Sequence, residues 1–445
     1  MPGQEHVPAR PRVAKPARLD GPELVSPADP PASAAIGAPG GTDLQPDRPR
    51  RSRTDHPAAA GLIALLAALA FALTRWQMWA QGSIARFILV GQYFARPTQL
   101  PHGIPVTPTY GYDGQFFYRL ALNPFNFHHT AYGITMDSPY RYMRIGYPTL
   151  TWLVSAGQHV LVPVILIAVN IAAIGAMGAM GGVFAQQGGR HALAGLLLPS
   201  YFGLLTSLSR DTAEPLAAVC LLAGLLAIRA RRPVLAAALL AYGVLTRETV
   251  MVAVFAIAVM RIVGMIRGQQ RPGRDDLAWV VPAAVFVAWQ VVVKAATGSF
   301  PLLADGGRNA GAPFIAPLKA LKHNLAHLNA HVVNQAHVVN QYDLWLMELA
   351  ILGIFAVAAL LSLRTTSAPV HERLALILYI VEICVVTPNT WNSIDADLRS
   401  FIEVYLLSVI ILLGTPRRWS WLLPSLAVLT LPALIGVTQL RLIGS

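Results

Sequence analysis

The stretch "RPRRSRTDHPAAAGLIALLAALAFALTRWQMW" (48–79) joins an arginine cluster to a long apolar run. A helix needs about twenty apolar residues to cross the hydrocarbon core of a bilayer, and arginine-rich flanks favour the cytoplasmic side. We therefore predict a first span over about 58–79 that starts in the cytoplasm. Arg75, Trp76 and Trp79 fall near its outer end, where arginine and aromatic side chains favour the headgroup region.

The composition of the whole chain indicates the same class of protein. Of its 445 residues, 55% are hydrophobic and only 13% are charged, whereas a soluble domain carries about 25% charged residues. Lysine and arginine exceed aspartate and glutamate by 34 to 22. In a membrane protein such an excess marks cytoplasmic loops, and the chain has no aromatic-and-basic RNA motif. We predict an all-α polytopic membrane protein that binds no nucleic acid.

The N-terminal segment differs from the rest of the chain. Residues 1–57 are rich in proline and arginine and show no apolar periodicity. Such a segment cannot bury enough apolar surface to offset its ordering entropy. We expect a disordered cytoplasmic tail over 1–57, followed by one transmembrane domain over 58–445.

The remaining basic loops set the expected topology, because all of them should share the cytoplasmic side. They are "RARR" (229–232), Arg267 with "RPGR" (271–274), Arg364 with "HER" (371–373), and "PRR" (416–418). Two long external loops follow from this topology, over 80–158 and over 296–343. The first loop is expected to contain interfacial helices, including a short helix over 146–158. The segment 233–266 is too short for two full spans and suits a hairpin of short helices. The count is about eleven spans, with the others at about 160–185, 192–208, 212–228, 277–295, 344–363, 374–388, 399–414 and 420–438.

An acidic residue stands out in the first external loop. The stretch "TYGYDGQFFYRLALNP" (109–124) places Asp113 between Tyr112 and Gly114, with Gln115, Phe116 and Tyr118 close behind. A plain Asp-Gly turn with packed aromatic rings would account for it structurally. A positioned carboxylate beside aromatic faces would also suit a bound sugar.

Further charged segments are expected on the same side. Charge at membrane depth is costly unless it is paired or faces water, which makes such residues functional candidates. A structural alternative pairs Arg247 with Glu248, and Arg210 with Glu214, which are four residues apart as on one helix face. The segments are "SPYRYMRIGYP" (138–148) with Arg141 and Arg144, "SRDTAEP" (209–215) with Arg210, Asp211 and Glu214, "LTRET" (245–249) with Arg247 and Glu248, and "DADLR" (395–399) with Asp395, Asp397 and Arg399.

These motifs together carry a family resemblance. "YDGQFFYRLALNPF", "YRYMRIGYPTL", "LSRDTAEPLA" and "LTRETV" resemble segments of bacterial cell-surface glycopolymer-type members of the GT-C superfamily, the polyprenol-phosphate-dependent membrane glycosyltransferases. The resemblance covers roughly 58–415. It implies inverting transfer of a sugar from a polyprenyl-phosphate donor to an envelope glycan, lipid or protein acceptor. That transfer would take place on the extracytoplasmic face of the inner or plasma membrane.

The resemblance also implies site roles. The first-loop acid of that superfamily acts as catalytic base or metal ligand, and by position this role falls on Asp113. Gly111 and Gln115 stand where a second acid is frequent, and Asp137 is the nearest substitute, so a divalent cation stays open and no other cofactor is implied.

The chemistry of sugar transfer suits the same residues. An acceptor hydroxyl that attacks an anomeric carbon needs a carboxylate to take its proton. The leaving phosphate needs a permanent, bidentate cation, which arginine supplies. Arg247 and Arg399 are the first choices for the donor phosphate, followed by Arg210. Arg141 and Arg144 would bind either phosphate or lipid headgroups, while the expected substrate-contacting or supporting residues are Tyr112, Gln115, Phe116, Tyr118, Asp211, Glu214 and Glu248.

Other motifs offer alternatives. His323, His327 and His331 recur every four residues, which suits zinc or, in our interpretation, an interfacial amphipathic helix. Glu348, Glu382 and Glu403 lie in apolar spans, as either proton-relay acids of a transporter or helix-to-helix hydrogen-bond partners. The second functional hypothesis is a transporter or flippase of a lipid-linked sugar or polymer, and a third is a scaffold subunit of an envelope complex.

Overall fold

The computed structural model describes residues 55–304, 312–327, 341–386, 390–391, 398–416 and 422–443. These residues are mostly helical, as an all-α chain requires. Almost all of the predicted tail 1–57, and with it the expectation of disorder, lies outside the described residues. The same holds for Asp395, Asp397 and His331.

Five segments among the described residues are long and apolar enough to cross a membrane. On α1, side chains such as Leu62, Leu66 and Leu73 are exposed, as expected of a surface that faces lipid. The five are α1 (Pro57–Met78), α4 (Val162–Gln187), Arg274–Thr297 with η6 (Arg274–Asp276) and α9 (Leu277–Thr297), α12 (Gln341–Ser362), and α16 (Leu422–Ile443), whose apolar part is Leu422–Gln439.

The shorter helices match most of the other predicted segments. Residues 233–266 form the expected hairpin, in which only Arg247, Glu248 and Thr249 separate α7 from α8. A proline lies in the first turn of both α6 and α7. Its missing N–H costs no helical hydrogen bond there. These helices are α6 (Glu214–Arg229), α7 (Pro233–Thr246), α8 (Val250–Ile266), α13 (Val370–Val385) and α15 (Ile402–Leu413).

The expected straight span over 192–208 is wrong. The segment divides into a 3-10 helix, η5 (Ala192–Leu197), and a short helix, α5 (Gly203–Ser209). Pro199 lies between them and supplies no backbone N–H, so the helical ladder cannot pass through it. The broken segment matters for function because α5 leads directly into Arg210.

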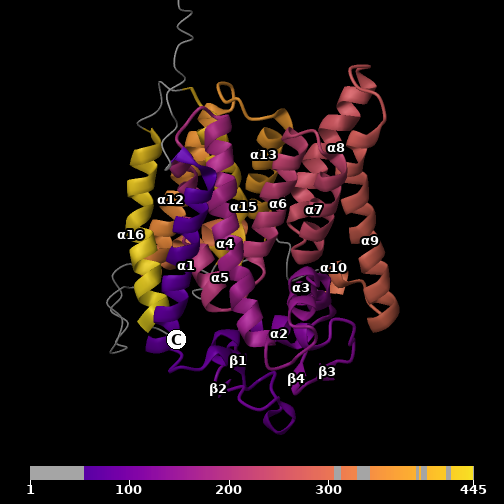
Figure 1. Ribbon diagram of the computed structural model, residues 1–445, viewed down its shortest axis with the longest axis vertical. Coiled ribbons are helices and arrows are strands. Elements are labelled where there is room, and N and C mark those ends of the chain that lie inside the picture. Colours follow the sequence, from indigo (N-terminus) through magenta and orange to yellow (C-terminus); the bar gives the residue numbers. More distant parts are fainter. Residues whose placement is uncertain are drawn as a thin grey trace, which may run out of the picture. The chain divides into compact units, whose positions relative to one another are not determined.

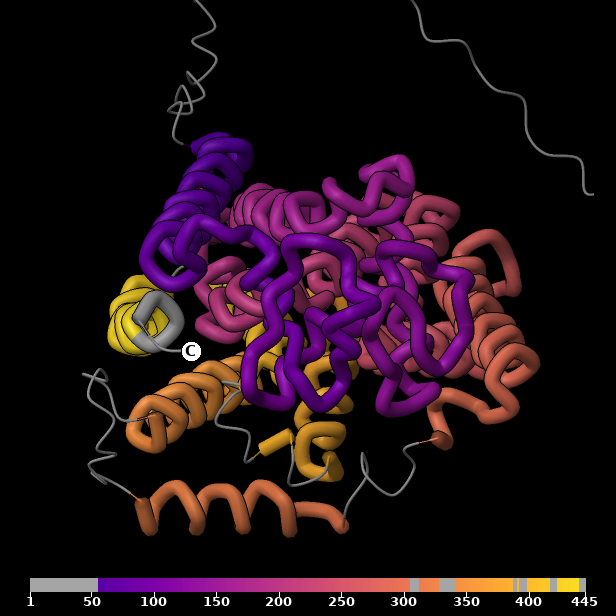
Figure 2. Tube along the Cα trace, turned by 90° about the horizontal axis from the view of Figure 1, so that it is seen from below, coloured from indigo at the N-terminus to yellow at the C-terminus, as the bar shows by residue number. Residues whose placement is uncertain are grey.

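The first loop is an ordered layer rather than a plain connection. Figures 1 and 2 show it across one end of the helices, drawn in indigo to purple. A two-residue parallel pair aligns Val90 with Val106, and an antiparallel pair aligns Thr130 with Thr135. Its elements are η2 (Ile84–Ile88), β1 (Val90–Gly91), η3 (Pro97–Gln99), β2 (Val106–Thr107), α2 (Gly114–Leu122), β3 (Thr130–Ala131), β4 (Ile134–Thr135), η4 (Pro139–Met143) and α3 (Gly146–Val154).

A separate hydrophobic core fastens this loop to the helices. Phe117 of α2 and Tyr147 of α3 meet edge to face, with ring centroids 5.6 Å apart. They belong to one buried cluster with Leu166 of α4, Leu216 of α6 and Val293 of α9. Buried aromatic side chains supply most of the apolar area in such clusters. The loop is therefore held at a defined position over the ends of α4, α6 and α9.

Small residues set the packing of α1 against α4. A Cβ added at Gly178 of α4 would lie 2.7 Å from the Ala60 carbonyl oxygen and 2.8 Å from the Ala64 Cβ. Gly182, four residues on, approaches Pro57 just as closely. Glycines at this spacing allow two membrane helices to approach until their backbones touch.

The basic loops gather at the other end of the helices from the first loop (Figure 1). The Arg229 guanidinium bonds Glu372 and donates to the Gln187 amide oxygen at 2.7 Å. Arg373 donates to the Leu363 carbonyl at 3.1 Å. Segments predicted to share one side of the membrane thus share one end of the helices.

The second loop is described only in part. It contains α10 (Pro301–Ala304) and α11 (Ile315–Ala326), while 305–311 and 328–340 lie outside the described residues. The rings of His323 and His327 lie in a tilted arrangement with centroids 4.4 Å apart, and His327 stacks on Tyr342 at 5.0 Å. α11 covers the first part of the expected amphipathic helix.

Candidate functional site

Two glycines place Asp113. Gly111 has a left-handed φ of +70°, and an added Cβ there would lie 2.4 Å from the Gly91 nitrogen. An added Cβ at Gly114 would lie 2.4 Å from the Arg210 carbonyl oxygen. The chain turns at one glycine and presses against the α5–α6 connection at the other. Asp113 lies at the start of α2, where the first loop packs against the helices. Its position is therefore fixed by tertiary contacts and not only by a local Asp-Gly turn.

Gln115 supports that turn from behind. Its side-chain oxygen accepts from the Gly91 N–H at 3.1 Å, and its amide nitrogen donates to the Tyr110 carbonyl at 3.1 Å. Phe116 and Tyr118 are also buried, with 3% and 1% of their surface exposed. These three predicted residues hold the loop rather than present a surface for a ligand.

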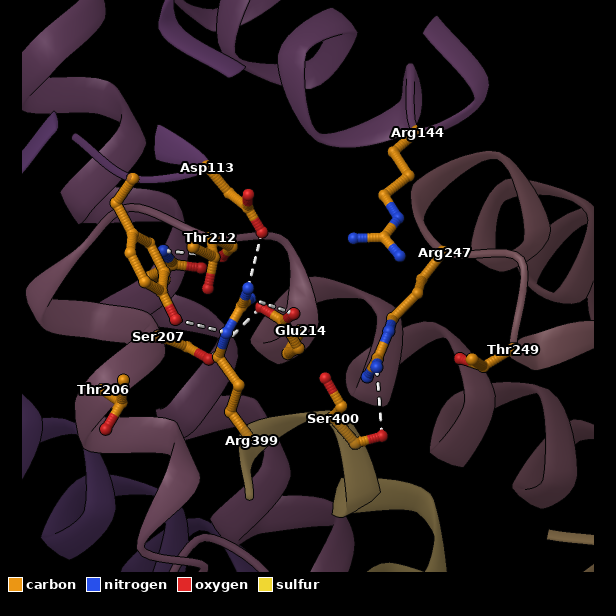
Figure 3. Close-up of polar contacts among 12 residues, drawn as sticks. Asp113, Arg144, Thr206, Ser207, Thr212, Glu214, Arg247, Thr249, Arg399 and Ser400 are labelled. Atoms are coloured by element: carbon orange, nitrogen blue, oxygen red, sulfur yellow. Dashed lines mark hydrogen bonds and ion pairs between the residues drawn. The ribbon is translucent and has the colours of Figure 1, made fainter. Parts of the chain in front are cut away.

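Two arginines grip the Asp113 carboxylate. Oδ1 lies 2.7 Å from Nη1 of Arg141, which belongs to η4. Oδ2 lies 2.5 Å from Nη2 of Arg399, which begins η7 (Arg399–Phe401). The residues come from three segments that are far apart in the sequence, and Figure 3 shows Asp113 and Arg399 facing each other. Asp113 is therefore paired on both oxygens.

Arg399 is the hub of the cluster. Its Nε donates to the Tyr112 hydroxyl at 2.8 Å. Its Nη1 bonds Glu214, the first residue of α6 (Figure 3). Its guanidinium carbon also lies 4.9 Å from the centroid of the Tyr112 ring. Arg210 approaches the same ring at 4.3 Å. Tyr112 thus contacts two guanidinium groups, whose attraction to an aromatic face is electrostatic.

A second group of charges lies beside this hub. Arg144 makes a bidentate pair with Glu248, through Nε at 2.9 Å and Nη2 at 2.6 Å. The Tyr140 hydroxyl donates to the same carboxylate and accepts from Arg144 at 2.6 Å. Arg247 lies on the same side of Figure 3 as Arg144, across from Asp113. Two further guanidinium groups therefore flank Asp113 and Arg399.

Arg247 is anchored to the last part of the chain. Its Nη1 lies 3.2 Å from Glu403 and its Nη2 donates to the Ser400 carbonyl at 3.1 Å. The Thr249 hydroxyl donates to Glu403 at 2.5 Å. Glu403 therefore acts as a hydrogen-bond partner between helices. This is one of the two interpretations offered for the acids in apolar spans.

The structural alternative, in which each motif forms its own ion pair, is wrong. Glu214 begins α6 while Arg210 precedes that helix, so the four-residue spacing does not put them on one helix face. Glu214 bonds Arg399, and Glu248 bonds Arg144 rather than its neighbour Arg247. The charged segments are thus joined to one another rather than closed within themselves.

The electrostatics of Asp113 follow from its neighbours. Burial alone would raise the pKa of this carboxyl, but the charges of Arg141 and Arg399, with Arg144 nearby, outweigh burial and hold the pKa well below its usual range. Asp113 is therefore ionised at neutral pH. A carboxylate so strongly stabilised is a weak proton acceptor while both arginines remain on it.

The carboxylates do not form a metal ligand set as they stand. Both oxygens of Asp137, the nearest candidate for a second ligand, bond Arg141, which also bonds Asp113. A guanidinium therefore joins the two carboxylates. The residues that the structure describes include no group of three or more His, Cys, Asp or Glu side chains able to hold a metal ion.

Asp211 is placed differently from the other predicted residues. It is fully buried with a left-handed φ of 50°, and its strongest charged neighbour is Arg75 at the end of α1. Neither of its oxygens has a hydrogen-bond partner among the described residues. The structure thus places Asp211 in the α5–α6 connection with Arg75 of α1 as its charged neighbour.

Sequence reasoning missed two members of the site. Tyr140 and Thr249 hold Glu248 and Glu403 through their hydroxyls. Arg144 follows Tyr140 by four residues, a spacing that returns a side chain to the same face of a helical turn, and this was the available signal. Thr249 had no comparable signal.

The site is thus an ionised carboxylate between two arginines, with three more guanidinium groups nearby and an aromatic ring at its side. Compared with models of known protein families and with curated proteins, the chain matches none.

Proposed function

We propose that this protein is an inverting glycosyltransferase of the GT-C type. It would move a sugar from a polyprenyl-phosphate donor to an envelope glycan, lipid or protein acceptor. The observation that carries the proposal is the Arg141–Asp113–Arg399 cluster, with Arg144, Arg210 and Arg247 around it. A general base and several phosphate-binding cations in one place are what this reaction requires.

The transfer would proceed by a single displacement. The acceptor oxygen attacks the anomeric carbon while the bond from that carbon to the phosphate oxygen breaks. The acceptor proton passes to Asp113, and polyprenyl phosphate leaves with the bonding electrons. The attack from the face opposite the leaving group inverts the configuration of the anomeric carbon.

The pairing of Asp113 suggests how the donor prepares the base. A phosphate is a strong bidentate partner for guanidinium groups. A donor phosphate that draws Arg399 or Arg141 away would leave Asp113 with less stabilisation, so its pKa would rise toward the ordinary range. The carboxylate would become an effective base only with donor in place, which protects the activated sugar from idle hydrolysis.

The membrane arrangement belongs to the same proposal. The five long segments together with the shorter helices α6, α7, α8, α13 and α15 would give ten segments that cross or enter the bilayer of the inner or plasma membrane. This is one fewer than the sequence predicted, because the segment 192–208 is broken. The tail would be cytoplasmic and the Asp113 cluster extracytoplasmic, in line with the basic loops at the other end of the helices.

The test compares cells that lack the protein with cells that carry Asp113→Asn. We expect the same envelope sugar to be missing from both strains, because the amide cannot accept the proton. Membrane levels of the variant, measured by quantitative blotting, should stay near those of wild type.

The transporter alternative predicts a different result. A flippase of a lipid-linked sugar needs arginines for the phosphate but no base, so Asp113→Asn would leave the envelope glycans normal. Normal glycans in that strain would overturn the transferase proposal.

A further inference from the structure

A cavity of about 580 Å³ opens at the end of the helices away from Asp113. Arg231 and Arg232, in the turn between α6 and α7, line it together with Arg261 of α8 and His371 of α13. The helix α6 has 16 residues between Glu214 and Arg229, so the cavity lies about 24 Å from the site. We propose that this cavity binds the phosphate headgroup of an anionic membrane lipid.

The charge of the lining favours an anion. Arg261 is engaged by Asp275 at 3.6 Å and Asp276 at 2.8 Å. Arg231 and Arg232 are exposed, and neither guanidinium has a hydrogen-bond or ion-pair partner among the described residues. Two guanidinium groups are therefore available to a phosphate, and Asp275 is the one acid in the lining.

The backbone fixes where these arginines begin. The Arg231 N–H donates to the Ile228 carbonyl at 2.9 Å, and the Arg232 N–H donates to the Ala227 carbonyl at 2.9 Å. Arg231 closes α6 in the left-handed region, with φ 55°, where glycine or asparagine is the usual residue. An arginine there costs about 1 kcal/mol of backbone strain.

The apolar surroundings indicate a lipid rather than free phosphate. Ile228, Ile257 and Met260 form much of the cavity wall. Val370, which also lines the cavity, is 51% exposed, and Val234, next in the chain to the lining residue Pro233, is 65% exposed. Acyl chains would cover these side chains while the headgroup meets the arginines, an arrangement typical of basic pockets between membrane helices.

The positive end of a helix adds to the attraction. Pro233, the first residue of α7, lines the cavity, so the N-terminus of that helix faces it. The partial positive charge there favours a phosphate and falls off within the first turn. Headgroup, arginines and helix end would thus meet at one place.

The experiment measures lipid binding to the purified full-length chain by native mass spectrometry in detergent. The added probes are phosphatidylglycerol, phosphatidylcholine and glycerol phosphate. We expect phosphatidylglycerol to bind most tightly, and the double variant Arg231→Gln with Arg232→Gln to bind it at least about tenfold more weakly, since two charge-assisted contacts are lost.

The control is the double variant Arg267→Gln with Arg271→Gln. It removes the same charge from exposed residues at the same end of the helices, outside the cavity lining. It should bind phosphatidylglycerol as wild type does.

Two results would overturn the proposal. Equal losses in the two double variants would show a general charge effect without a pocket. Displacement of the lipid by equimolar glycerol phosphate would show that a soluble phosphate is the ligand. Neither result bears on Asp113, because sugar transfer is measured separately.

Discussion

Asp113 and its arginines come from charged segments that could each be recognised in the sequence. The predicted topology placed these segments on one side of the membrane, and this was enough to predict that they lie close together. The individual partners could not be predicted. Glu214 bonds Arg399, which is 185 residues away in the chain, and no local spacing encodes a contact between such distant residues.

The geometry of Arg399 leads to a prediction at this scale. Three nitrogens of its guanidinium serve Tyr112, Asp113 and Glu214 separately. Lysine keeps the charge but cannot fill that fork. We expect Arg399→Lys to lower the transfer rate at least about 10²-fold, measured with a polyprenyl-phosphate sugar as donor.

An exposed arginine provides the control. Arg364→Lys changes the same side chain at an exposed residue away from the cluster and should leave the rate unchanged. A rate near wild type for Arg399→Lys would remove Arg399 from phosphate binding.

Glu248 yields a pH prediction. Burial would raise the pKa of this carboxyl, but Arg144 outweighs burial through charge and hydrogen bonds and lowers the pKa from 4.5 to about 2. Its stabilising effect is complete above the unfolded pKa and is lost as the pH falls toward the folded value. We expect the melting temperature to fall between about pH 4.5 and pH 2 for this reason.

A substitution separates this effect from general acid denaturation. Glu248→Gln should be less stable at pH 7, because Arg144 loses its charged partner. Its stability should then change less than that of wild type between pH 4.5 and pH 2, as followed by thermal unfolding. Parallel curves for the two proteins would contradict the assignment.

At the scale of elements, apolar length predicted most helices well. The first span, the hairpin over 233–266 and the short helix at the end of the first loop all lie where the hydropathy pattern indicated. The segment 192–208 failed because its hydropathy is continuous while Pro199 interrupts its hydrogen bonds. Hydropathy reports burial in lipid and carries no information about a broken helical ladder.

The α1–α4 contact offers a prediction at this scale. Gly178→Leu would force a side chain against the Ala60 carbonyl and Ala64. We expect a loss of about 1–3 kcal/mol, the usual cost of overpacking, seen as a lower melting temperature in nanodiscs.

Gly353 of α12 is the matched control. A Cβ added there meets nothing within 4 Å, so Gly353→Leu should be tolerated. Equal destabilisation by both changes would show that leucine disturbs either helix without regard to packing.

At the scale of the whole molecule, the two ends of the helices differ in kind. One carries the Asp113 cluster and the first loop, and the other carries the basic loops and the arginine-lined cavity. The sequence predicted this division through the distribution of arginine. It did not predict the cavity, whose lining comes from four separate segments.

The division predicts how the chain lies in the membrane. We expect a membrane-impermeant thiol reagent applied to intact cells to label His102→Cys, an exposed residue of the first loop, and to spare Gln269→Cys. Both changes are made with Cys220 and Cys384 replaced by alanine. The reverse pattern would invert the orientation.

Two tight contacts have a consequence for how any substrate arrives. Gly114 presses on the Arg210 carbonyl, and Gly146 lies against Thr246, where an added Cβ would come within 2.4 Å of the hydroxyl oxygen. The first loop is thus packed closely against the helices at two places, and we expect it to stay in position over Asp113 when a substrate binds. A long-chain lipid would have to slide in sideways from the bilayer, between helices, with its head first.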